Sequence, residues 1–316
     1  MRCHLSALCC ARARSHVRAH KNPAVAVAAA AAAAAAIKAQ PATPCCRDTP
    51  RITRAKLSAW FDHALAPVSS FRWDSALGAQ AFAQLRRKRI LVTRHCESTY
   101  QVACNDPRYC EFPGRRRLWC NIRFRDSPLT ERGKLQAAAL GALLHSNGPP
   151  QLLVSSPLTR CLQTGALMYP QLFLADTQPP TTTIKVLSKL LPELVHSWGD
   201  TGRSLDEVCD EHPELERFRA AESRSRFQKV GSVPRPCRWQ PVIDEHLGGE
   251  NMRPKEPRKH ARQRAGLFWL WLAERKEIHV VVVTHSKLIK HGENIWLLGD
   301  NIPQVRNGEA FRVVFE

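Results

Sequence analysis

Short runs of branched apolar residues recur along the second part of the chain, and polar residues follow most of them. Such residues suit strands that are covered on both faces of a sheet. The predicted strands are 90–92, 152–154, 184–187, 277–286 and 309–315. Segments with helical signals lie between them, and the alternation predicts an α/β fold: a three-layer α/β/α sandwich with a largely parallel central sheet.

Helix start and stop signals mark the segments between these strands. The predicted helices are 75–87, 130–147, 157 onward, 204–218 and 260–276. In the second helix, Thr130 is placed to cap the start and the Asn147-Gly148 pair to end it. Its apolar face is expected to consist of Leu135, Ala138, Ala139, Ala142 and Leu143.

Composition divides the chain into three parts. Residues 1–47 carry seven lysines and arginines and no acidic residue, and they include nine consecutive alanines within 24–37. Residues 48–84 combine a linker with the accessory helix predicted from residue 75, and residues 85–316 hold the alternating strands and helices. We therefore expect one folded catalytic domain, residues 85–316, behind a leader that takes no part in it.

Three interpretations of the leader's role remain open. A basic, acid-free, alanine-rich segment fits an organelle transit peptide, while an alanine run behind a basic region also fits the apolar part of a secretory signal. The third interpretation is a low-complexity, disordered extension. Residues 24–37 are fewer than the roughly 20 strongly apolar residues of a membrane span, so no span is expected. The localisation expected is intracellular, in the plastid or mitochondrion if the leader is a transit peptide.

The charge of the chain is strongly positive. Its 47 lysines and arginines outnumber its 28 acidic residues, giving a formal net charge of +19. Outside the leader, much of the excess lies in two short runs, 115–117 and 253–264, without the aromatic and glycine pattern of an RNA-binding sheet. The 12 cysteines form no C-x-x-C pair. These patterns argue against a nucleic-acid partner and against structural zinc.

Similar polar groups follow three of the predicted strands. Arg94 and His95 follow the first, Arg160 follows the second after a short turn, and His285 ends the strand 277–286. In a parallel sheet these strand ends share one edge. Guanidinium groups, imidazoles and helix amino termini gathered there would form a pocket for a phosphate group.

A histidine in such a pocket can attack phosphorus if its second nitrogen is held by a hydrogen bond. The arginines would then stabilise the charge on the transferring group. A carboxyl group must protonate the leaving oxygen, and Glu193 is placed to do so after the strand 184–187. Glu97, Asp200 and Glu250 are alternative carboxylates.

Four motifs in this order resemble the histidine phosphatase superfamily, also called phosphoglycerate-mutase-like, in its branch with a late Thr-His-Ser motif. The motifs are Arg94–Ser98, Ser127–Gly133, Ser155–Thr164 and Val283–Ser286. The resemblance implies that His95 becomes phosphorylated, that Arg94, Arg160 and His285 hold the phosphoryl group, and that Glu193 donates the proton. It implies no metal and no organic cofactor.

The function that follows from the resemblance is hydrolysis of a small phosphorylated substrate, a phosphomonoester, through a phosphohistidine on His95. A mutase-type phosphotransferase and a non-catalytic phospho-ligand-binding protein are the alternatives. Cys96 stands where the family usually has glycine, which motivates the second alternative, and Gln101 stands where many members have asparagine. The loop 102–125 could border the pocket, where its arginine run 115–117 would favour further negative charge, but a solvated loop is the preferred interpretation. The sequence does not fix the oligomeric state or the substrate.

Overall fold

The computed structural model describes residues 51–55, 57, 75–110, 114–145, 148–173, 183–188, 190–216, 218, 256–291, 294–295 and 305–316. The chain divides into two units, Met1–Thr43 and Pro44–Glu316, and every described residue belongs to the second. The predicted leader therefore lies outside the described residues. Within them, no helix has the length and apolar character that crossing a membrane requires.

The described strands form a central sheet with the order β1-β8-β2-β5-β3-β4. Their bounds are β1 Arg51–Ile52, β2 Arg89–Arg94, β3 Leu152–Ser155, β4 Ile184–Leu187, β5 His279–Thr284 and β8 Ala310–Phe315. The strands β2, β5, β3 and β4 run parallel, whereas β8 pairs with β2 in the antiparallel direction. The largely parallel sheet predicted from the sequence is confirmed.

Successive residues of the central strands point to opposite faces of the sheet, as the strand period of two requires. Val280 and Val282 belong to one buried cluster, with Phe268 and Trp269. Val281 and Val283 belong to a second cluster on the other face, with Leu140. Burial on both faces explains why these strands are apolar throughout rather than alternating.

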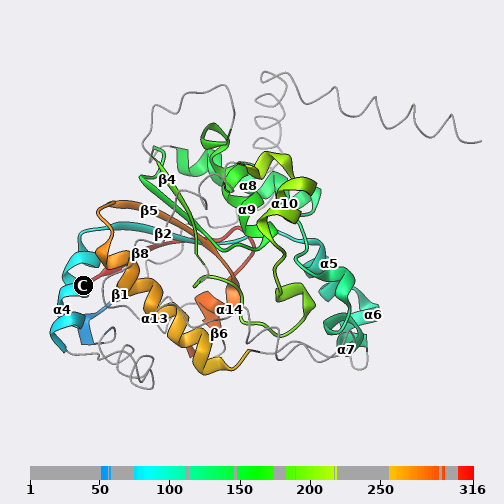
Figure 1. The fold of residues 1–316 in the computed structure, drawn as a ribbon, viewed down its shortest axis with the longest axis horizontal. Coiled ribbons are helices and arrows are strands. Elements are labelled where there is room, and N and C mark those ends of the chain that lie inside the picture. The colour runs from blue at the N-terminus through cyan, green and yellow to red at the C-terminus, as the bar shows by residue number, and fades with distance from the viewer. Residues whose placement is uncertain are drawn as a thin grey trace, which may run out of the picture. The chain divides into compact units, whose positions relative to one another are not determined.

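Helices cover each face of the sheet (Figure 1). The first cluster includes residues of α4 (Ser75–Arg86) and α13 (Arg258–Glu274). The second includes residues of α8 (Glu131–Leu144) and α9 (Thr159–Met168), and α10 (Leu205–Glu211) lies on the same side. This arrangement confirms the predicted three-layer α/β/α sandwich.

Shorter elements complete the described part of the chain. They are α5 Thr99–Asn105, α6 Pro107–Cys110, α7 Gly114–Trp119, α14 Ser286–Ile289, β6 Lys290–His291 and β7 Asn294–Ile295. Short 3₁₀ turns lie at Ile122–Phe124, Pro170–Leu172, Trp198–Asp200 and Pro213–Leu215. The helix predicted over 204–218 ends at Glu211, just before Pro213, because proline provides no N–H to continue the helix.

The buried face of α8 differs from the prediction. Leu135 and Leu143 are 50% and 54% exposed, so they do not belong to it. Leu140 and Leu144 are buried instead, and Gly141 lies so close to Met168 of α9 that a Cβ would come within 2.3 Å of the Met168 carbonyl oxygen. The contact with α9 therefore sets the rotation of this helix. Because this helix contains many alanines, its pattern of apolar and polar residues does not clearly distinguish the buried face from the exposed one.

The start of α9 also differs from the prediction, since the helix begins at Thr159 rather than at Pro157. The buried carboxylate of Asp126 fixes this start: it accepts hydrogen bonds from the Thr159 amide (2.8 Å) and hydroxyl (2.7 Å). Asp126 has a φ of 48°, in the left-handed region that few side chains adopt. An acceptor from another segment thus caps the helix that carries Arg160.

The region before residue 85 contributes to the folded core. β1 pairs with β8, and Leu57, Phe82 and Leu85 are buried in the same cluster as Trp269. Phe82 and Trp269 both pack edge-on against Phe315 of β8. The packed core therefore includes residues from the segment that the sequence assigns to a linker and accessory helix.

Candidate active site

The carboxyl ends of β2, β3 and β5 lie side by side at one edge of the sheet. The His95 amide donates to the Thr284 carbonyl (2.9 Å), and the Ser156 amide donates to the Val283 carbonyl (3.0 Å). These bonds continue the hydrogen-bond pattern of the sheet by one residue beyond the ends of β2 and β3. They bring Arg94, His95 and His285 to one place, as the parallel arrangement predicts.

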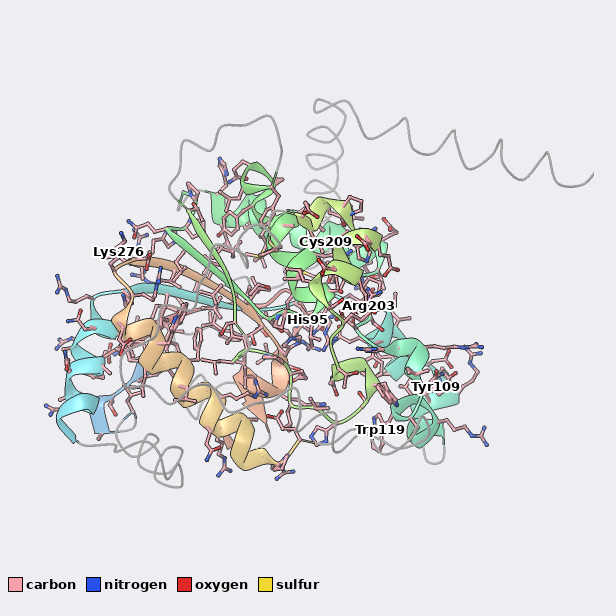
Figure 2. All side chains as sticks on the ribbon, viewed as in Figure 1. His95, Tyr109, Trp119, Arg203, Cys209 and Lys276 are labelled. Carbon is pink, nitrogen blue, oxygen red and sulfur yellow. The ribbon has the colours of Figure 1, made fainter. Side chains whose placement is uncertain are left out.

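A cavity of about 580 Å³ opens at this edge. Arg94, His95, Arg160 and Glu193 line part of it, and we call these four residues the charged side of the cavity. Figure 2 shows His95 beside the ends of the central strands. Four of the five site residues predicted from the sequence thus face one cavity. The fifth, His285, lies behind it.

The ring of His95 is buried and held at both nitrogens. Its Nδ1 lies 2.7 Å from the backbone carbonyl of Cys96, which can only accept, so Nδ1 carries the proton in the neutral ring. Its Nε2 accepts a hydrogen bond from the Arg160 Nε (3.2 Å) and keeps the lone pair. Burial, then Arg160 and Arg94, lower the pKa of His95 well below its ordinary 6.5. The ring is therefore neutral at physiological pH, with its basic nitrogen held toward Arg160.

Arg160 is buried and makes contacts in three directions. Besides His95, it donates to the Gly199 carbonyl (2.7 Å) and lies 3.6 Å from the carboxylate of Asp200. These partners come from the 3₁₀ turn Trp198–Asp200, which contacts the first turn of α9 through Arg160. The guanidinium is thus held rigidly at the cavity before any ligand binds.

Arg94 brings a second guanidinium to the cavity. Its Nη1 donates to the Val305 carbonyl (2.6 Å), whereas its buried Nε has no hydrogen-bond partner among the described residues. Burial lowers the pKa of Arg94 to about 10, and the nearby Glu193 opposes this shift. An unpaired buried donor costs free energy, and an anion in the cavity would offset that cost.

Glu193 lies in the loop after β4 and is buried. Its carboxylate accepts from the Leu194 amide (3.0 Å) and, at 3.5 Å, from the Lys287 amide. Burial raises the pKa of Glu193; Lys287 acts in the opposite direction, and Asp200 adds to the rise. A carboxyl group in this environment keeps its proton to higher pH than an exposed one, as a proton donor requires.

A buried ion pair holds the Glu193 loop in place. Arg264 of α13 makes two hydrogen bonds of 2.9 Å to Glu256 and also donates to the carbonyls of Leu190 and Pro192. Glu256 in turn donates its amide to the Val195 carbonyl (2.9 Å). The loop is therefore fixed on both sides of Glu193.

Lys287 and Asp200 also line the cavity. Sequence reasoning named Asp200 only as an alternative acid and did not name Lys287. The Lys287 Nζ lies 3.8 Å from Asp200, whose carboxylate also accepts from the Ser197 hydroxyl (2.9 Å). Asp200 is thus engaged with two cations. Lys287 follows the Thr-His-Ser motif directly, and that position was the available signal for it.

His285 is fully buried and does not line the cavity. Its Nε2 lies 2.8 Å from the Ser156 hydroxyl and 3.3 Å from the Cys161 thiol. Its ring packs against His95 with centroids 5.0 Å apart. Burial, followed by Arg160 and His95, lowers the pKa of His285 well below 6.5. In this arrangement the neutral ring supports His95 from behind.

The thiol of Cys96 points away from the cavity. Cys96 is fully buried in a small cluster with Leu129 and Ala137, and it is not among the cavity-lining residues. Burial raises the pKa of this thiol to about 12, so it remains protonated. The departure from glycine at this position therefore leaves the cavity open.

The Ser127–Gly133 motif docks the start of α8 onto the loop after β2. Thr130 donates its amide to the Glu97 carbonyl (3.0 Å) and its hydroxyl to the Glu97 carboxylate (2.8 Å). A Cβ on Gly133 would lie 2.0 Å from that carbonyl oxygen, so the position requires glycine. Glu97 is thus engaged in holding α8, and the other alternative acid, Glu250, lies outside the described residues.

The fold and the site together define an α/β protein with a cavity at the carboxyl edge of its sheet, lined by Arg94, Arg160 and the buried His95. Residues 90–179 match the family model of the histidine phosphatase superfamily (branch 1). The matched segment includes Arg94, His95 and Arg160 and ends before Glu193 and His285. Through this segment the chain resembles the histidine phosphatase superfamily.

Individual relatives are distant. Phosphoglycerate mutase-like protein 1 of Arabidopsis thaliana is 24% identical, and the match covers 70% of this chain and 76% of that protein. The alpha-ribazole phosphatase from Shigella flexneri is 18% identical, with a TM-score of 0.35 over 64% of this chain and 75% of that chain. YhfR of Bacillus stearothermophilus is 19% identical, with a TM-score of 0.39; the match covers 71% of this chain and 89% of that chain.

Proposed function

We propose that the protein hydrolyses phosphomonoesters through a phosphohistidine intermediate on His95. The proposal rests on the hydrogen bonds and the protonation of the His95 ring. Its Nδ1–H is held by the Cys96 carbonyl, its pKa is lowered, and its Nε2 keeps a lone pair beside Arg160. A neutral imidazole fixed in this tautomer is prepared for attack on phosphorus. The superfamily match supports the same reaction class.

In the first step, Nε2 forms a bond to phosphorus and the bond from phosphorus to the ester oxygen breaks. The protonated Glu193 gives its proton to that oxygen, and the alcohol leaves. Arg94 and Arg160 stabilise the charge on the non-bridging oxygens. In the second step, the Glu193 carboxylate takes a proton from water as the water attacks phosphorus. The nitrogen–phosphorus bond then breaks, inorganic phosphate leaves, and both groups return to their starting states.

The test uses the full chain with p-nitrophenyl phosphate and 3-phosphoglycerate, measuring release of inorganic phosphate. We expect turnover that His95→Ala abolishes. His279→Ala is the matched control, because His279 lies at the opposite end of β5. Full activity in His95→Ala would contradict the proposal. Conversion of one phosphoglycerate into another without free phosphate would instead support a phosphotransferase.

We also propose that residues 1–47 address the protein to an organelle. The acid-free, basic and alanine-rich composition supports this proposal. The test is imaging of a fluorescent fusion to residues 1–60. Plastid or mitochondrial fluorescence is expected, and diffuse fluorescence would contradict it.

A further inference from the structure

The side of the cavity opposite the strand ends carries aromatic and apolar residues, together with the polar Gln101 and Asn105 of α5. Tyr100 and Cys104 come from α5, Tyr109 from α6, and Leu118 and Trp119 from α7; we call these five residues the helical wall. Figure 2 shows Tyr109 and Trp119 on these helices, to one side of His95. A phosphomonoester bound at His95 would extend its alcohol part toward this wall.

Among the described side chains of this segment, Arg108 and Arg117 give the wall no positive charge. Arg108 forms an ion pair with Asp106 (2.6 Å) and lies 5.7 Å from the Tyr109 ring centroid. Arg117 is exposed and is not a lining residue. The side chains of Arg115 and Arg116 lie outside the described residues. The described wall therefore offers rings rather than cations to the alcohol part of a substrate.

Two of the wall's rings, those of Tyr100 and Tyr109, are held in place by neighbouring residues. The Tyr100 hydroxyl donates to the Ser197 hydroxyl (2.8 Å), and a Cβ on Gly199 would lie 2.7 Å from the Tyr100 ring. Phe124 packs against both Tyr100 (5.9 Å between centroids) and Tyr109 (6.5 Å, edge-on). Prepositioned rings lose little entropy when a ligand ring packs on them.

Of the two polar lining residues of α5, Gln101 is already engaged, whereas Asn105 is exposed to solvent. Gln101 donates to Asn307 (3.1 Å), and Asn307 donates back to Gln101, so the two amides satisfy each other. Two further cations line the cavity, Lys287 and Arg306, and both come from other segments. Lys287 lies beside Asp200. Arg306 is thus the cavity cation to which a second anionic group on the substrate would be drawn.

The geometry points to a substrate whose alcohol part carries an uncharged planar ring, which packs against Trp119 and Tyr109 while the phosphoryl group lies at His95. This inference rests on the proposed function, since it names the substrate class of the same site. Aromatic packing and burial of one ring face correspond to roughly a tenfold gain in affinity over a short alkyl group.

The test measures binding to the full chain by calorimetry with three phosphonates that cannot be hydrolysed. They are 2-phenylethylphosphonate, ethylphosphonate and 2-carboxyethylphosphonate. The first is expected to bind about tenfold more tightly than the other two. In Trp119→Ala this preference should fall below about threefold, and in Trp119→Phe most of it should return. Trp271→Ala, on α13, is the matched tryptophan control and should keep the full preference.

Equal binding of the three phosphonates, tightest binding of the carboxyethyl compound, or no binding of any would each overturn the inference. So would a preference that survives in Trp119→Ala. Turnover of 2-phenylethyl phosphate is measured in parallel. Ring-selective binding without turnover would contradict the proposed function while supporting the ring site, so the two failures are distinguishable.

Discussion

The two sides of the cavity are built in different ways. The charged side comes from the end of β2, the first turn of α9 and the loop after β4, and its residues are held in place by buried partners such as Gly199 and the Arg264–Glu256 pair. The helical wall comes from three helices of 7, 4 and 6 residues, and one of them, α5, also carries Val102, which is 49% exposed. Changes on the charged side should therefore affect every substrate alike, whereas changes on the wall should affect the choice among substrates.

Removal of Arg160 should have the largest effect. Arg160→Leu takes away the hydrogen bond to His95 Nε2 and a charge that stabilises the transition state. We expect kcat/KM to fall on the order of 10³-fold for all phosphomonoesters, with their ratios unchanged. Steady-state kinetics on a ring-bearing and a short alkyl phosphate measures both quantities. Arg312→Leu, on the exposed face of β8, is the control. A loss under tenfold, or a loss confined to one substrate, would contradict the expectation that changes on the charged side affect every substrate alike.

Replacement of Glu193 should reduce the rate by about 10²-fold with alkyl phosphates, whose leaving groups need a proton. Activity requires protonated Glu193 and neutral His95. Because burial raises the pKa of Glu193 above 4.5 and lowers that of His95 below 6.5, activity should fall on the alkaline side as Glu193 loses its proton. Glu193→Gln should abolish this alkaline limb in the pH profile of kcat/KM. The exposed Glu131→Gln should keep it, and an unchanged limb in Glu193→Gln would assign the proton donor elsewhere.

Removal of the Lys287 charge should have a smaller effect. The cation lowers the pKa of Glu193, so its loss lets that pKa rise further. In Lys287→Gln the alkaline limb should move to higher pH, with a roughly threefold to tenfold fall in kcat/KM. Lys287→Arg should restore both values. Movement of the limb to lower pH would show that Lys287 does not act on Glu193 through its charge.

Cys96→Gly should have the smallest effect on activity, because the thiol lies outside the cavity. We expect rates within about twofold of the parent and a loss of roughly 1–2 kcal/mol in the free energy of unfolding, from lost packing and added chain entropy. Urea titration measures the second quantity. A tenfold gain in activity would show that Cys96 does constrict the site.

The sequence predicted the location of a residue correctly where its pattern is compatible with a single arrangement in space. Parallel strands with apolar residues on both faces can place Arg94, His95 and His285 only at one edge, and the structure does so. Which side of His95 each group occupies depends on side-chain direction. The position of His285 behind His95 therefore could not be read from its motif.

Other features depended on packing between distant segments. The rotation of α8 follows from the contact of Gly141 with Met168, which no periodicity reveals. The helical wall comes from helices too short to show a period, and the arginine run suggested a positive charge that the described residues of this wall do not carry. Lys287 went unnoticed because a single lysine after a motif resembles any solvated residue.

The state of His95 during turnover tests the account most directly. The full chain is mixed with a phosphomonoester, quenched within the first turnovers, and its covalent phosphate is located by mass spectrometry. The account predicts an acid-labile phosphate on His95, present in His279→Ala and absent in His95→Ala. Turnover without a phosphorylated protein, or a phosphate on His285 instead, would contradict it.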